Sequence, residues 1–288
     1  MKITVASVAF ALITIVSLSV TANRENTLDT VDTVDPEADR LALQKYFQSR
    51  FPAVPMDEYI NGIYALDADS RSQWEEIEEF PPYEFDIEEG EVLFNTPFAN
   101  GKGYGDCFAN GGIGIRQNYP LWDNSADRVV TLEKAINECR IANNEKPLPW
   151  RKGKLAKISA YMAFTSRGEV FNIKIPNKKA MLAYQDGKKM FFSRQGQLNM
   201  SCANCHITGA NVRLRAELSS PALGQVTHFP AFRSQWGELG TLHRRYHGCQ
   251  KMIRAVPFSV QGNELSNLEY YQTYMSNGLA VNGPGARK

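Results

Sequence analysis

Residues 202–206, Cys-Ala-Asn-Cys-His, constrain the fold of this chain more than any other feature. Cys-x-x-Cys-His is the sequence at which a c-type haem is attached. Two thiols at this spacing can form thioethers with both vinyl groups of one porphyrin, and the adjacent histidine can then bind the iron. A zinc site would want a second Cys or His pair at similar spacing, and the chain has no second Cys-x-x-Cys. We therefore expect one covalent haem c on Cys202 and Cys205, with His206 as axial ligand.

The N-terminus predicts export from the cytosol. A single lysine, Lys2, precedes the uncharged apolar run 3–20, and small residues lead up to Ala22. This pattern is typical of a signal peptide, residues 1–22, cleaved after Ala22. An uncleaved membrane anchor is the alternative, because the run approaches the length of a membrane span. Cleavage would place the mature protein in the periplasm, free of the membrane, where disulfides form.

Composition limits the classes of partner and indicates how the chain after residue 22 is divided. Among 288 residues, 32 Lys and Arg offset 31 Asp and Glu, so a nucleic acid is not the expected partner. Residues 23–78 are expected to form an N-terminal extension, partly disordered because 23–37 is polar. A helix is predicted from Pro36 to about Gln48, ending before Pro52.

An internal repeat relates two parts of the chain. Residues 119–168 resemble 229–278 at a constant offset of 110, which aligns Cys139 with Cys249. The repeat predicts a mainly α fold of two tandem domains related by duplication, over 79–175 and 176–288. The matched apolar positions have helical spacing and end near a glycine, a common helix terminus. They are Leu155, Ile158, Tyr161 and Phe164, matched to Leu265, Leu268, Tyr271 and Tyr274.

The two halves differ where a haem would be attached. The first half keeps Cys107 but has Asn110 and Gly111 in place of the second cysteine and the histidine. Its loop from the cysteine to the equivalent proline is also shorter, so one haem is predicted rather than two. If the ancestor of Cys139 ligated the iron beside Cys107, these two cysteines would be close enough to form a disulfide after haem loss. Cys249 then remains unpaired, as a candidate reactive thiol.

Several segments resemble one known family. They are Gly111–Pro120, Val130–Glu133, Ala135–Arg140, Leu268–Tyr270, Tyr274–Gly278 and Val281–Arg287. Together these segments identify the chain as a member of the SoxA family, the catalytic c-type cytochrome subunits of the SoxAX complexes of bacterial thiosulfate oxidation. The resemblance covers nearly the whole mature chain. Its departure at Asn110 and Gly111 resembles the family's monohaem type.

The resemblance implies two cytochrome c-like domains and an L-cysteine S-thiosulfotransferase activity. The family transfers thiosulfate to a cysteine of the SoxYZ carrier protein, and two electrons pass through haem to a small partner cytochrome, SoxX. Cys249 matches the active-site cysteine, which ligates the iron opposite the histidine and carries persulfide sulfur. Arg245 matches the substrate-contacting arginine, whose planar fork suits a sulfonate.

Two alternatives remain open at this point. One is a pure electron-transfer cytochrome in which Met252 or Met275 replaces Cys249 as the distal ligand. The other is a thiosulfate dehydrogenase that joins two thiosulfates into tetrathionate. The sequence assigns no role to the remaining charged neighbours, which are Arg244, Lys251, Arg254, His243 and His247.

Overall fold

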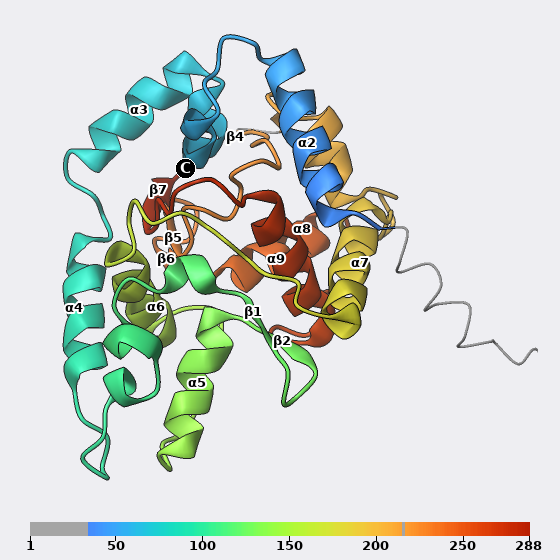
Figure 1. The fold of residues 1–288 in the computed structure, drawn as a ribbon. Coiled ribbons are helices and arrows are strands. Elements are labelled where there is room, and N and C mark those ends of the chain that lie inside the picture. Colours follow the sequence, from blue (N-terminus) through green and yellow to red (C-terminus); the bar gives the residue numbers. More distant parts are fainter. Residues whose placement is uncertain (1–33, 215–216) are drawn as a thin grey trace, which may run out of the picture. The chain divides into compact units, whose positions relative to one another are not determined.

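Helices supply most of the regular structure, as the sequence predicts. The computed structural model describes residues 34–214 and 217–288, so the predicted signal peptide and residues 23–33 of the extension lie outside the described residues. Residues Asp35–Lys288 form one compact unit (Figure 1). Its longer helices are α2 (Pro36–Arg50), α3 (Ala68–Glu78), α4 (Glu84–Asn95), α5 (Leu132–Ala142), α6 (Lys154–Phe164), α7 (Lys178–Phe192), α8 (Leu242–Met252) and α9 (Asn263–Met275).

Short helices and short strands connect these long helices. Strands β1 and β2 pair antiparallel, β3 and β4 form a second hairpin, and the third sheet has the order β6-β5-β7. The short helices are η2 (Asp57–Ala65), η3 (Tyr104–Asp106), η4 (Ala109–Gly112), η5 (Arg116–Asn118) and the π-helical η6 (Asn204–Thr208). The strands are β1 (Leu121–Asp123), β2 (Arg128–Val130), β3 (Arg213–Leu214), β4 (Glu217–Leu218), β5 (Ala231–Arg233), β6 (Glu238–Gly240) and β7 (Gly285–Arg287).

Helix α2 begins and ends where its sequence dictates. Asp35 caps the helix, since its Oδ1 accepts from the backbone N–H groups of Glu37 and Ala38 at 3.0 Å each. Pro36 stands at the first helical position, where the missing N–H costs nothing. The helix runs to Arg50, slightly beyond the predicted end and still before Pro52. Residues 35–37, which the sequence analysis included in a disordered stretch, therefore form the cap and first turn of α2.

Two helix pairs have the same construction. Helix α4 packs on α6, and α7 packs on α9. A Cβ added at Gly90 of α4 would lie 2.2 Å from the carbonyl oxygen of Lys157, and one added at Gly187 of α7 would lie 2.0 Å from that of Asn267. Only glycine permits such a close approach of two backbones, so each helix crossing depends on its own glycine.

The same succession of elements occurs in both halves at the predicted offset of 110. Hairpin β1–β2 leads into α5 and then α6, and hairpin β5–β6 leads into α8 and then α9 (Figure 1). Each first strand follows a cis proline, Pro120 or Pro230. The predicted helical positions around Leu155 and Leu265 lie in α6 and α9, respectively. The halves also differ, since β7 at the C-terminus pairs with β5 only.

The buried core follows this arrangement. Eleven side chains pack inside the first half, and a smaller cluster around Tyr83, Ala160 and Leu239 joins α6 to β6 and β7. Helix α9 is buried along most of its length. Within the described residues, no helix is long and apolar enough to cross a membrane.

Candidate haem and sulfur-transfer site

A tight turn holds the two cysteines of the motif. Ser201 and Asn204 cap each other: the backbone N–H of Ser201 donates to Asn204 Oδ1 at 2.9 Å, and that of Asn204 donates to Ser201 Oγ at 3.2 Å. This reciprocal pair resembles a capping box, with Asn204 in the place of the usual Glu or Gln. Cys205 and His206 follow within η6, and Cys202, Cys205 and His206 are all half-buried.

The loop after β4 fixes the histidine. Ser219 Oγ donates to the carbonyl of Cys205 at 2.7 Å, and the N–H of Ala222 donates to that of His206 at 2.7 Å. The ring Nδ1 of His206 lies 2.9 Å from the carbonyl oxygen of Ser220. Because a carbonyl only accepts, Nδ1 carries the proton and Nε2 keeps its lone pair. This is the tautomer that a metal-binding histidine requires.

Helix α8 brings the second pair of candidate residues to this turn. Arg245 and Cys249 are four residues apart, so they share one face of the helix. Burial raises the pKa of Cys202 to about 12, and the nearby charge of Cys249 raises it further. The pKa of Cys205 is also raised, by burial and by the charge of Cys249, and the charge of Arg245 partly opposes this increase. The structure therefore brings together the three cysteines and the arginine that the sequence singled out.

Arg245 also acts on the histidine. Burial lowers the pKa of His206 to about 4, the bond to Ser220 opposes this change, and the charge of Arg245 adds to it. A neutral imidazole is the form that binds iron. The donor set thus fits a c-type haem: two thiols in one turn, a neutral histidine whose Nε2 keeps its lone pair, and a third thiol on α8.

A chain of amides leads away from the histidine. Gln225 Nε2 lies 3.0 Å from both ring nitrogens of His206, so it points along neither lone pair. Gln225 Oε1 accepts from Gln272 Nε2 at 2.6 Å, and Gln272 Oε1 accepts from the hydroxyl of Tyr246. Sequence reasoning missed Ser220, Gln225 and Gln272, because no spacing rule relates loop amides to a distant histidine.

The N-terminal helix supports the same turn from outside. Arg50 of α2 donates to the carbonyls of Ile207, Thr208 and Ala210 at 2.6, 3.0 and 2.8 Å. These carbonyls lie at the end of the helical turn that contains His206, where a cation is favourable. The same helix is tied to α7 by Asp39, whose carboxylate accepts from Lys188.

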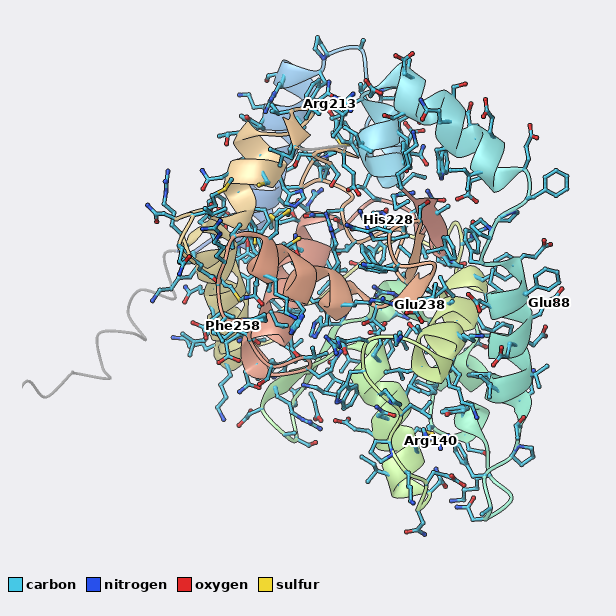
Figure 2. All side chains as sticks on the ribbon, turned by 180° about the vertical axis from the view of Figure 1, so that it is seen from behind. Glu88, Arg140, Arg213, His228, Glu238 and Phe258 are labelled. Carbon is cyan, nitrogen blue, oxygen red and sulfur yellow. A yellow bond between two sulfur atoms is a disulfide. The ribbon has the colours of Figure 1, made fainter. Side chains whose placement is uncertain are left out.

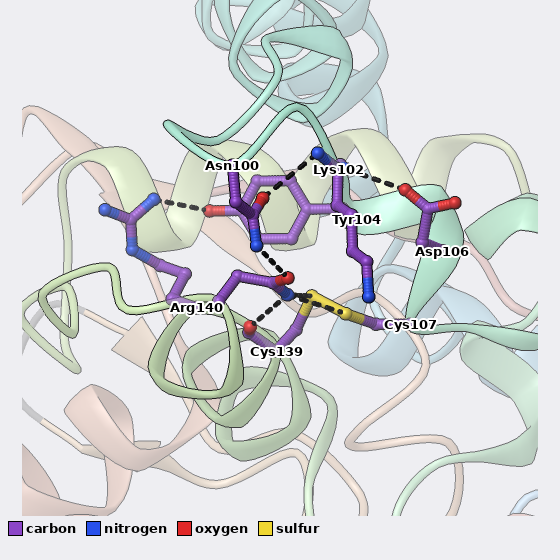
Figure 3. Close-up of a disulfide and its surroundings, with 9 residues drawn as sticks. Asn100, Lys102, Tyr104, Asp106, Cys107, Cys139 and Arg140 are labelled. Atoms are coloured by element: carbon purple, nitrogen blue, oxygen red, sulfur yellow. Dashed lines mark hydrogen bonds between the residues drawn. A yellow bond between two sulfur atoms is a disulfide. The ribbon is translucent and has the colours of Figure 1, made fainter.

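The first half has a disulfide at the equivalent place (Figure 3). Cys107 and Cys139 are bonded, with 5.8 Å between their Cα atoms, which confirms the predicted pairing. The amide of Asn143 donates to the carbonyl of Cys139 at 2.8 Å, and Arg140 donates to the hydroxyl of Tyr104 at 2.9 Å. Cys202, Cys205 and Cys249 are free thiols.

The two histidines of α8, His243 and His247, have different surroundings. His243 is buried, accepts from the N–H of Gln261 at 3.0 Å and lies 3.2 Å from a carboxylate oxygen of Glu269. His247 is partly exposed. In residues 34–214 and 217–288, no group of three or more His, Cys, Asp or Glu side chains is arranged to hold a bare metal ion. Met275 is buried and Met252 is partly exposed.

The fold and the Cys-x-x-Cys-His turn define a protein of the cytochrome c class. Residues 89–171 match the family described as SoxA/TsdA, cytochrome c domain. Curated proteins narrow this class, because relatives more than half identical over most of the chain share one description, L-cysteine S-thiosulfotransferase subunit SoxA. The chain belongs to the SoxA family.

The individual similarities are extensive. The chain is 56% identical to the SoxA subunit of Chlorobaculum tepidum over 252 residues, 88% of each protein. It is 52% identical to that of Allochromatium vinosum over 260 residues, 90% of this chain and 92% of the relative. The crystal structure of SoxXA from P. pantotrophus superposes with a TM-score of 0.69 at 27% identity, covering 77% of this chain and 84% of that one.

Proposed function

We propose that this protein is the SoxA-type subunit of an L-cysteine S-thiosulfotransferase. It joins thiosulfate to a cysteine of a SoxYZ-like carrier protein. A new S–S bond forms between the carrier thiolate and the terminal sulfur of thiosulfate, and two electrons leave to a SoxX-like partner cytochrome. The observation that carries this proposal is the meeting of Arg245 and Cys249 with the Cys202–His206 turn, in a chain of the SoxA family.

One haem c, held by Cys202 and Cys205, supplies the one-electron acceptor that this oxidation needs. His206 and Cys249 would be its axial ligands. The support from the structure is the tautomer of His206, which leaves Nε2 free, and the position of Cys249 beside both motif cysteines. A thiolate ligand donates electron density to iron and favours its oxidised state.

Arg245 is suited to hold the substrate. Its guanidinium can make two charge-assisted bonds to sulfonate oxygens. Residues four apart on a helix have Cβ atoms about 5–6 Å from each other, so a thiosulfate held at Arg245 can present its terminal sulfur to the sulfur of Cys249. Cys249 is then placed to carry sulfur as a persulfide, since sulfur atoms exchange by attack of one on another.

We infer that the fold arose by duplication and that only the second half, 176–288, kept its haem. Three features support this inference: the common offset of the elements, the paired glycine crossings, and the disulfide at the first half's motif position. The backbone of Asn110 and Gly111 is left-handed, with φ of 51° and 62°. Asn and Gly tolerate this conformation and most other residues do not.

The assembly and location follow from the same family. We propose a heterodimer with a SoxX-like cytochrome, because the similar crystal structure is described as SoxXA. The predicted signal peptide, residues 1–22, and the Cys107–Cys139 disulfide both support a periplasmic protein.

The test is the Cys249→Ala variant of the haem-loaded heterodimer. We expect electron paramagnetic resonance to show altered axial ligation and a mass-spectrometric assay to show no thiosulfate added to the carrier, while the porphyrin stays attached. Met252→Leu and Met275→Leu are matched controls that should keep the wild-type spectrum. Full carrier conjugation by Cys249→Ala would leave only the electron-transfer function, and tetrathionate as the main wild-type product would indicate a thiosulfate dehydrogenase.

A further inference from the structure

Two buried arginines lie side by side next to the proposed site. Strands β5 and β7 pair in parallel with Arg233 opposite Arg287, so both side chains leave the sheet on the same face. Each residue is only 7% exposed. Guanidinium groups stay charged in proteins, and two of them in an interior are unfavourable unless anions compensate them.

The protein supplies only part of that compensation. Arg233 Nη2 donates to both carboxylate oxygens of Glu217, at 2.8 and 2.7 Å. Arg287 donates from Nη1 to the carbonyl of Ala286 at 2.7 Å, and within the described residues its buried Nη2 has no hydrogen-bond partner. Glu78 favours the charge of Arg287 electrostatically. The hydrogen bonds that Glu78 accepts, however, come from Trp74, Tyr83 and the backbone of Ala286.

A third buried group completes the cluster. His228 is 5% exposed, lies in the interior of the molecule (Figure 2), and its Nδ1 has no partner among the described residues. A Cβ added at Gly285 would be 3.5 Å from both His228 Cβ and Arg287 Nη1, so glycine opens the space between these two side chains. Burial lowers the pKa of Arg287 to about 10 and that of His228 well below its usual value. Glu217 thus balances Arg233, whereas Nη2 of Arg287 and Nδ1 of His228 have no hydrogen-bond partner among the described residues.

The cluster lies close to residues of the proposed haem site. On one side, the position of a Cβ at Gly62 is 4.0 Å from Arg287 Nη2 and 3.9 Å from the Cβ of Ser220, whose carbonyl holds His206. On the other side, burial and the charge of Arg245 lower the pKa of Arg233, and the charge of Cys249 opposes this. The arginines are therefore candidates to hold part of a group bound by His206 and Cys249.

The first half of the chain lacks these cations. At the offset of 110, Arg233 corresponds to Asp123 and His228 corresponds to Asn118. The positive groups are thus present only in the half that carries the Cys-x-x-Cys-His turn. This difference associates the cluster with the half to which the haem is assigned.

We infer that Arg233, Arg287 and His228 form a buried anion site that binds the carboxylates of the haem. The inference rests on the haem assignment of the proposed function, and it adds the residues that neutralise the acidic edge of that group. The same chemistry would also accept the sulfonate of thiosulfate, so the experiment must separate these two sources.

The test compares Arg287→Gln, Arg233→Gln and Glu217→Gln in the haem-loaded heterodimer. Redox titration gives the haem reduction potential, and a separate assay gives KM for thiosulfate. Losing a nearby positive charge favours the oxidised haem, so both arginine variants should have a lower potential. Glu217→Gln removes a negative charge and should raise the potential. A tenfold change in the redox equilibrium corresponds to 59 mV for one electron.

Controls separate charge from folding. Arg287→Lys keeps the charge and should keep a potential close to wild type. Arg71→Gln removes a partly buried, paired charge in α3 and should change neither the potential nor KM. If Arg287→Gln fails to fold, the upward shift in Glu217→Gln still decides the question. A raised KM with an unchanged potential would assign the anion to the substrate, and unchanged values of both would overturn the site. If Cys249→Ala kept its carrier-conjugation activity, the proposed function would be refuted. The potentials measured for the arginine and Glu217 variants would still decide whether the anion site exists.

Discussion

At the residue scale, Arg245 and Cys249 have different tasks, and substitution separates them. Arg245→Ala should leave the haem spectrum nearly unchanged, because the proposed role of this arginine is to bind substrate rather than iron. It should lower kcat/KM for thiosulfate by about 10–150-fold, the loss of a charge-assisted contact of roughly 1.5–3 kcal/mol. Arg245→Lys should recover only part of this, since an ammonium keeps the charge and loses the fork. Steady-state kinetics would contradict this role if Arg245→Ala had wild-type kcat/KM.

The residues that sequence reasoning found belong to a short motif with a known chemical role, or to the internal repeat. Cys202, Cys205 and His206 are recognisable from spacing alone, and the repeat led to the Cys107–Cys139 pair. Ser220 and Gln225 could not be found in this way, because their role depends on how a loop folds back on the histidine. Arg233 left no signal either, because it aligns with Asp123 in a hairpin whose residues differ at every position between the two halves.

At the scale of elements, α2 acts on the haem-binding turn through Arg50. Arg50→Met should remove three hydrogen bonds to the carbonyls after His206 and lower the free energy of unfolding by about 1.5–3 kcal/mol. Haem content per folded chain should fall as well, because the turn loses its support. Lys45→Gln, an exposed change in the same helix, should stay within about 0.5 kcal/mol of wild type. Denaturant unfolding and haem absorbance measure the two effects. Equal values for the two variants would show that Arg50 does not support this turn.

A second element-scale prediction concerns the buried carboxyl of Glu133 in α5. Burial and the nearby charge of Glu269 raise the pKa of Glu133, and Ser159 donates to its Oε1 at 2.8 Å. A raised pKa means that the folded state binds a proton which unfolding releases above the ordinary pKa of 4.5, so stability falls as pH rises from there.

Glu133→Gln should therefore be more stable than wild type near pH 7. This advantage amounts to about 1.4 kcal/mol per unit of pKa difference and should disappear as pH falls to about 4.5. Urea unfolding between pH 4.5 and 8 provides the measurement. Glu88→Gln on the exposed face of α4 is the control and should show little dependence. An advantage that grew toward low pH would mean the opposite protonation of Glu133.

At the scale of the whole molecule, pattern and periodicity predicted the helices better than their assembly. The offset of 110 anticipated where α6 and α9 lie. It did not anticipate that α2 packs across the second half, or that β7 extends only one of the two corresponding hairpins. Those contacts join segments far apart in sequence, and their energies depend on surfaces that exist only after each half has folded.

The difference between the halves leads to the last prediction, one haem per chain with a disulfide at the other motif position. A cysteine and a histidine at positions 110 and 111 would have to adopt the left-handed backbone found there, and Cys107 is already bonded. The disulfide joins residues 32 apart, for which loop closure contributes about 3–4 kcal/mol. Replacing both Cys107 and Cys139 by Ala should lower the free energy of unfolding by that amount and leave the pyridine haemochrome value at one. Two haems in wild-type protein, or none in the double variant, would show that the first half still takes part in binding haem.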